Sequence, residues 1–155
     1  MRTLLAVDLG VRTGLAVYGD DGRLRAYRSQ NYGTAARLRR AAPAVLDATA
    51  GVAAVIVEGG GPLFGAWERE ANRRGLDVVH VFAEDWRRAL MLPREWRSGA
   101  EAKSRADALA RQVIEWSEAA RPTSLRHDAA EAILIGLYGV LRLGWLPALP
   151  GALRR

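Results

Sequence analysis

Four acidic residues occupy positions where a folded chain rarely carries a charge without a partner. Asp8 and Glu58 each end an apolar run that is typical of a buried strand, and Asp128 and Glu131 open an apolar helix that continues to Leu143. Charged residues are seldom buried unpaired, and ligands of α/β proteins bind at the ends of strands. The four carboxylates on three elements therefore predict a pocket for divalent cations.

The predicted pocket determines which metals and which reaction to expect. Crowded carboxylates raise one another's pKa, so a bare cluster is unfavourable near neutral pH. Mg²⁺ and Mn²⁺ accept such hard oxygen ligands, whereas Zn²⁺ prefers His or Cys, and the chain contains no cysteine. Two such ions about 3.5–4 Å apart can activate water and stabilise the leaving oxygen of a phosphodiester. The chemistry predicted is metal-dependent hydrolysis of a nucleic-acid backbone.

Each acid taken singly also has a purely structural interpretation. Asp8 next to Gly10 suits a turn, Asp128 suits a helix N-cap, and Glu131 suits the first helical turn, where the helix dipole favours a negative charge. Glu58 is harder to explain in this way because it follows five apolar residues. The occurrence of all four in this order favours the metal site.

The elements that must position these acids follow from hydrophobic periodicity and turn residues. The first and fourth predicted strands are continuous apolar runs, typical of central parallel neighbours, which would place Asp8 and Glu58 side by side. A short helical turn is expected at 86–90, and Pro43 predicts that the helix around it divides into two short pieces. Strands are predicted at 2–8, 13–19, 23–30, 52–58 and 77–82, and helices at 34–49, 63–74, 101–119 and 126–143. This alternation predicts an α/β fold with a mixed sheet and helices on both faces.

Composition restricts the class of protein. The 155 residues, 50% of them hydrophobic, suit one compact domain, which we place at 1–146, with 147–155 as a flexible tail. Neither a signal peptide nor a membrane span is predicted, so we expect a cytoplasmic protein. The net charge is +6, and Lys103 is the only lysine among 23 basic residues. Such a charge favours acidic partners.

The motifs resemble a known family. Asp8-Leu9-Gly10, Val57-Glu58 and Asp128-Ala129-Ala130-Glu131-Ala132 are similar to the RuvC-type Holliday-junction resolvases of the ribonuclease H-like superfamily. The resemblance implies a five-stranded mixed sheet with helices on both faces. It also implies a homodimer that binds branched DNA and nicks four-way junctions symmetrically, with no nucleotide cofactor and no membrane partner. The resemblance also implies two Mg²⁺ per active site, with Mn²⁺ as a substitute.

The resemblance assigns roles to individual residues. Asp8 would bridge both metals, while Glu58, Asp128 and Glu131 would complete the ligand set. The fourth acid is Glu where cellular members usually carry Asp, and Trp86-Arg87 resembles the phage or organellar branches. A phage-infected host or an organelle therefore remains an open origin beside the bacterial cytoplasm.

Three further residues are candidates beside the acids. Lys103 would stabilise charge in the transition state, unless it is an ordinary solvated helix residue. His127 would ligate a metal or move a proton, unless it is a bystander. Phe64 is the candidate wedge that stacks on an unpaired base, whereas Trp67 is expected to pack in the core.

Arginines are expected to bind the DNA phosphates, which gives affinity and register without sequence information. Those expected to contact DNA are Arg69, Arg73, Arg74, Arg87, Arg88, Arg94, Arg97 and Arg105.

Competing functions stay open at this point. The related RuvX (YqgF) group acts on structured RNA precursors, but its members generally lack an acid in the context of Glu58. A junction-binding protein without catalysis is disfavoured because all four acids are present. An actin-like ATPase would need two such domains.

Overall fold

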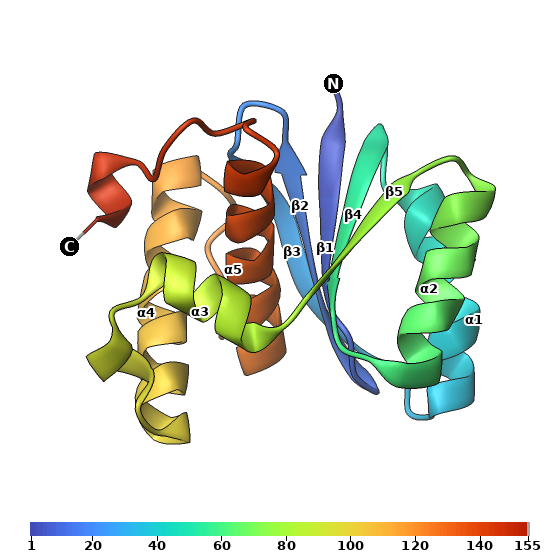
Figure 1. The fold of residues 1–155 in the computed structure, drawn as a ribbon, viewed down its shortest axis with the longest axis horizontal. Coiled ribbons are helices and arrows are strands. Elements are labelled where there is room, and N and C mark those ends of the chain that lie inside the picture. The colour runs from blue at the N-terminus through green and yellow to red at the C-terminus, as the bar shows by residue number, and fades with distance from the viewer. Residues whose placement is uncertain (155) are drawn as a thin grey trace.

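A five-stranded mixed sheet forms the centre of the protein in the computed structural model, which describes residues 1–154. The strand order is β3-β2-β1-β4-β5, as the ribbon in Figure 1 shows. The strands are β1 (Thr3–Asp8), β2 (Arg12–Gly19), β3 (Leu24–Asn31), β4 (Val52–Glu58) and β5 (Asp77–Val81).

Strand pairing places the ends of β1, β4 and β5 at one edge of the sheet. β1 pairs antiparallel with β2 and parallel with β4, in a register that puts Asp8 opposite Glu58. β4 pairs parallel with β5, so that Glu58 lies opposite Val81. The expectation that the two apolar runs are parallel neighbours in the sheet is therefore confirmed.

Helices cover both faces of the sheet. Figure 1 shows α1 (Ala35–Ala48) and α2 (Gly61–Arg73) on one face, and α3 (Ala83–Leu90), α4 (Gly99–Ser117) and α5 (His127–Arg142) on the other. Two short 3₁₀ helices complete the chain, η1 (Pro93–Trp96) and η2 (Gly151–Leu153). The predicted α/β fold, a five-stranded mixed sheet with helices on both faces, is confirmed.

Each face of the sheet has its own hydrophobic core. Leu5, Val7 and Trp67 belong to the core under α1 and α2. Ile133 and Trp86 belong to the larger core under α3, α4 and α5. Since alternate residues of a strand point to opposite faces, the continuous apolar run of β1 contributes to both cores.

The central helix α5 approaches the sheet very closely. A Cβ on Gly14 of β2 would lie 1.9 Å from the backbone oxygen of Asp128, and one on Gly136 would lie 2.3 Å from the ring of Tyr18. Tyr18 is completely buried and donates a hydrogen bond to the backbone oxygen of Ile133. The glycines therefore set the distance between α5 and β2, the strand that pairs with β1.

Two predicted elements differ from the structure. The helix around Pro43 is one continuous α1, not two pieces. Leu38 and Val45 are buried on either side of the proline. Packing therefore stabilises the helix both before and after Pro43, and it stays continuous. The predicted single turn at 86–90 is the longer helix α3, which begins at Ala83 and spans eight residues.

The C-terminal segment packs against the rest of the molecule. Leu153 of η2 is only 2% exposed and lies in the same core as α4. Arg154 donates a hydrogen bond from Nε to the backbone oxygen of Leu149 at 2.7 Å. The packed unit therefore extends beyond residue 146, and flexibility of 147–155 stays a prediction.

Within residues 1–154, no helix combines the length and the hydrophobicity required to cross a membrane.

Candidate metal centre

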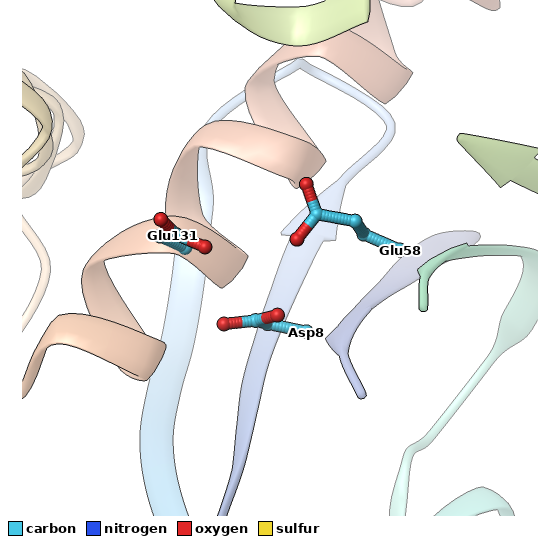
Figure 2. A group of neighbouring side chains, drawn as sticks. All are labelled: Asp8, Glu58 and Glu131. Carbon is cyan, nitrogen blue, oxygen red and sulfur yellow. The ribbon is translucent and has the colours of Figure 1, made fainter. Parts of the chain in front are cut away.

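Three carboxylates from three different elements meet at the edge of the sheet. One oxygen each of Asp8, Glu58 and Glu131 lies within 4.8 Å of the other two. Figure 2 shows the three side chains directed toward one another from β1, β4 and α5. The structure thus brings together three of the four acids that the sequence suggested.

Local structure explains this convergence. Asp8 and Glu58 are the last residues of parallel neighbours in register, and adjacent strands lie about 4.8 Å apart. Glu131 lies in the second turn of α5 and is 8% exposed. The close contact between Gly14 and the backbone of Asp128 holds the start of α5 over the ends of the strands.

The cluster is electrostatically unfavourable without a cation. Burial, with the charges of Glu131 and Glu58 next in importance, raises the pKa of Asp8 to about 9. Burial also raises the pKa of Glu58, while a hydrogen bond from Trp86 opposes that rise. Three carboxylates within reach of one another form a hard-oxygen donor set that fits Mg²⁺ or Mn²⁺. The residues present therefore suit the metals that the sequence predicted.

Two consecutive residues of α3 contact the acids from the side of β5. The Nε1–H of Trp86, which is completely buried, donates a hydrogen bond to Oε1 of Glu58 at 2.7 Å. Arg87 places Nη2 at 3.6 Å from Oε1 of Glu131, and its guanidinium carbon lies 5.3 Å from the Trp86 ring centroid. Sequence reasoning missed the contact of Trp86, although the Trp-Arg pair shortly after a strand was visible.

Asp128 lies next to the group of three rather than within it. Its Oδ2 accepts a hydrogen bond from the hydroxyl of Ser29 on β3 at 2.6 Å. Its charge nevertheless contributes to the raised pKa of Asp8. Sequence reasoning missed Ser29, which gives no motif signal of its own. Asp128 is thus held by β3, whereas Trp86 holds Glu58 at the end of β4.

His127 contacts the same acid as Arg87. Its Nε2 lies 2.8 Å from Oε1 of Glu131, and its side chain is 40% exposed. His127 therefore adjoins the cluster and is partly exposed to solvent, and its role as a ligand or proton carrier stays a prediction.

Lys103 is exposed in the second turn of α4. The beginnings of α4 and α5 lie at the same end of the molecule in Figure 1, which is also the end where β1 finishes. This is the end that carries the acids, and Lys103 as a catalytic residue stays a prediction.

The two aromatic candidates of α2 both pack. Trp67 is completely buried, in agreement with the core role expected for it. Phe64 is half-buried against the same core and stacks on His80, with ring centroids 4.0 Å apart and planes 18° apart. Because α2 begins at Gly61, Phe64 lies inside the helix and not in an open loop. Phe64 as a wedge stays a prediction, for a helical residue whose ring already stacks on His80.

The candidate DNA-binding arginines divide by their surroundings. Arg105 is buried and forms an ion pair with Glu95 at 2.8 Å, so its assignment to DNA is wrong: a phosphate contact would break a buried pair. Arg73 and Arg74 both pair with Glu70, and Arg74 also pairs with Asp47. The exposed candidates are Arg69, Arg73, Arg88, Arg94 and Arg97.

Comparison with known proteins gives structural relatives only. No protein-family model matches the sequence, and no curated protein matches it either. The fold is similar to that of T. thermophilus RuvC in complex with Holliday junction substrate, with a TM-score of 0.62 and 20% identity over 93% of this chain and 97% of the other. It is also similar to the yeast mitochondrial Holliday junction resolvase Ydc2, with a TM-score of 0.53 and 10% identity over 93% and 81%. This chain therefore has the ribonuclease H-like fold that those two proteins share.

Proposed function

We propose that this protein is a divalent-metal-dependent DNA endonuclease that resolves four-way (Holliday) junctions by paired, symmetric nicks. The observation that carries the proposal is the convergence of Asp8, Glu58 and Glu131 at one sheet edge. The fold adds support, because the similar solved structures include a RuvC bound to a Holliday junction substrate. The net charge of +6 suits a polyanionic substrate.

The acids of the cluster would hold the metals. Asp8, Glu58 and Glu131, with Asp128 next to them, would hold two Mg²⁺ or Mn²⁺ ions. Bound there, the ions would supply an activated water and stabilisation of the leaving oxygen. Asp8 must release its proton before it can ligate, since its pKa is raised to about 9 in the metal-free protein.

Other residues of the chain would position the acids and the DNA. Trp86 fixes one oxygen of Glu58 by its hydrogen bond. Arg87, 27% exposed and 3.6 Å from Glu131, would contact a phosphate bound at the cluster. Exposed Lys103 would approach the reacting phosphate from α4, and His127 would assist at the solvent side.

Symmetric cleavage requires two sites. A four-way junction offers two equivalent strands, and a homodimer related by a twofold axis presents one carboxylate cluster to each. We therefore propose branched DNA and a second copy of this chain as the partners, in the cytoplasm.

The direct test is incubation with labelled four-way junction, duplex, flap and single-stranded DNA, with and without Mg²⁺. We expect paired nicks in the junction only, and only with metal. Asp8→Asn or Glu58→Gln should abolish nicking while junction binding persists, because each removes a metal ligand. Asp107→Asn, an exposed acid paired with Arg111 on α4, is the matched control and should cut normally.

Three results would count against the proposal. Equal cutting by Asp8→Asn and the parent would remove the carboxylate site from the reaction. Junction binding without cleavage under Mg²⁺ or Mn²⁺ would favour a non-catalytic binder. Preferential cleavage of structured RNA would favour an activity like that proposed for the RuvX group.

A further inference from the structure

Phe82 is an exposed aromatic residue beside the carboxylate cluster. Its side chain is 63% exposed, and of the large apolar side chains in residues 1–154 only that of Met1 is more exposed. It directly follows β5, whose last residue, Val81, lies opposite Glu58. An aromatic ring in this position meets neither core of the protein, so packing does not explain it.

The ring of Phe82 continues a row of aromatic rings. Its centroid lies 5.1 Å from that of His80, with planes 42° apart, and the other neighbour of His80 is the stacked ring of Phe64. His80 is fixed because Nε2 lies 2.5 Å from the backbone oxygen of Gly59, the residue after Glu58. The row is therefore anchored at its middle ring to the residue that follows a candidate metal ligand.

The backbone under Phe82 is also held in place. The backbone N–H of Phe82 donates to Oδ2 of Asp85 at 2.8 Å, and the N–H of Asp85 donates to the backbone oxygen of Phe82 at 2.9 Å. These reciprocal bonds start α3, which also carries Trp86 with its bond to Glu58. The Phe82 ring is thus presented to solvent from a backbone that is fixed relative to the acids.

The spacing of the strands sets how far Phe82 lies from the reacting phosphate. β1, β4 and β5 are neighbours in the sheet, and two strand spacings amount to about 10 Å. Phe82 follows Val81 and, with His80 and Phe64, lies on the α2 side of the sheet, so a DNA strand that crosses the end of the sheet from Asp8 would bring a base one or two nucleotides from the bound phosphate to its ring. Every nucleobase offers a face that can stack on an aromatic ring.

We propose that Phe82 is a stacking site for an unpaired nucleobase next to the phosphate that binds at the carboxylate cluster. The proposal rests on the proposed function and adds a residue that selects DNA whose bases are free to unstack. Flush duplex DNA would offer no such base, so Phe82 would favour branched over linear substrates.

The test uses a four-way junction with 2-aminopurine placed in turn at each position flanking the cut, with Ca²⁺ replacing Mg²⁺ to suppress cleavage. Stacking quenches 2-aminopurine fluorescence. We expect quenching at one position with the parent and Phe82→Trp. Phe82→Leu, which keeps an apolar side chain, should lose that quenching and bind the junction about ten-fold more weakly. Leu143→Ala, 41% exposed at the far end of α5, is the matched control and should behave as the parent.

The outcomes separate this proposal from the proposed function. If the parent resolves junctions but Phe82→Leu matches it in affinity and fluorescence, the stacking site is refuted and the nuclease stands. If Phe82→Leu changes the sedimentation of the free protein and not the fluorescence, Phe82 belongs to a contact with a second copy. If the parent neither binds nor cuts branched DNA, both proposals fail.

Discussion

At the scale of single residues, the dominant feature is a set of acids held together against their mutual repulsion. Burial of Asp8, together with the nearby charges of Glu131 and Glu58, raises its pKa to about 9. The folded metal-free protein therefore holds a proton that the unfolded chain releases near pH 4. Stability and metal binding should both depend on that proton.

Asp8→Asn should stabilise the metal-free protein at neutral pH. The pKa of Asp8 is higher in the folded protein than in the unfolded chain. The free energy of unfolding of the parent therefore falls as the pH rises from about 4, the unfolded pKa, to about 9, the folded pKa. In EDTA we expect the variant to gain at least about 1 kcal/mol over the parent at pH 7.5 and nothing at pH 4, as measured by urea unfolding. The order should reverse with saturating Mg²⁺. A stability difference that does not change between the two pH values would contradict this account of Asp8.

Trp86→Phe should weaken metal binding without removing any ligand. The substitution keeps an aromatic ring in the core but deletes the N–H that fixes Oε1 of Glu58, and loss of a bond to a metal ligand costs roughly 10–100-fold in affinity. Isothermal titration with Mg²⁺ measures the change. Trp116→Phe, on α4 beside Arg23, is the control. Unchanged Mg²⁺ affinity in Trp86→Phe would show that Trp86 packs in the core without affecting the metal ligand Glu58.

At the scale of elements, the site depends on how closely α5 lies on the sheet. Glu131 reaches Asp8 and Glu58 only because the first turn of α5 rests on Gly14 of β2. β1 and β4 bring their acids together by register alone. The site is therefore formed by one strand pair and one helix, and the helix is the part that can be displaced.

Gly14→Ala should move α5 and weaken the site. The added Cβ would lie 1.9 Å from the backbone oxygen of Asp128, so the helix must shift. Overpacking of this kind costs about 1–3 kcal/mol, and we also expect reduced Mg²⁺ affinity because Glu131 moves with the helix. Gly99→Ala, where an added Cβ meets nothing within 4 Å, is the control. If Gly14→Ala matches the parent in urea unfolding and Mg²⁺ titration, the close approach does not set the site.

At the scale of the whole molecule, opposite charges are separated. The net charge is +6, yet one sheet edge carries a compact group of carboxylates. Not all of the arginines are available to DNA, because Arg105 forms a buried ion pair with Glu95. Exposed arginines around the acidic pocket would hold the phosphates, while the metals screen the acids from them.

Binding to junctions should therefore weaken steeply with salt, with a log–log slope of about −0.9 per neutralised phosphate. The two ends of α5 offer a matched pair of exposed arginines. Arg126 precedes the helix beside Asp128, and Arg142 ends it, about 16 Å from Glu131. Arg126→Gln should reduce the slope by about one, and Arg142→Gln should leave it unchanged, as measured by fluorescence anisotropy. Equal slopes for both variants would show that DNA does not lie at this end.

Much of the architecture was predictable because its signals are local. Apolar runs, turn glycines and helical periodicity identify the strands and helices within a few residues, and two continuous apolar runs predict the parallel neighbours β1 and β4. Asp8 and Glu58 end those runs, so their adjacency follows from strand register. That inference needs no knowledge of side-chain packing.

Only the tertiary structure decided which side chains the acids and arginines contact. Trp86 with Glu58, Ser29 with Asp128, and Arg105 with Glu95 are pairs of residues that lie apart in sequence. Helix packing sets such pairs, and the same packing turned Phe64 inward against His80 while leaving Phe82 exposed. The sequence by itself determined the elements and the acids at their ends, because periodicity and turn chemistry act over a few residues. The contacts that tune the site depend on how α3 and α5 dock on the sheet, and docking is a property of the whole folded chain.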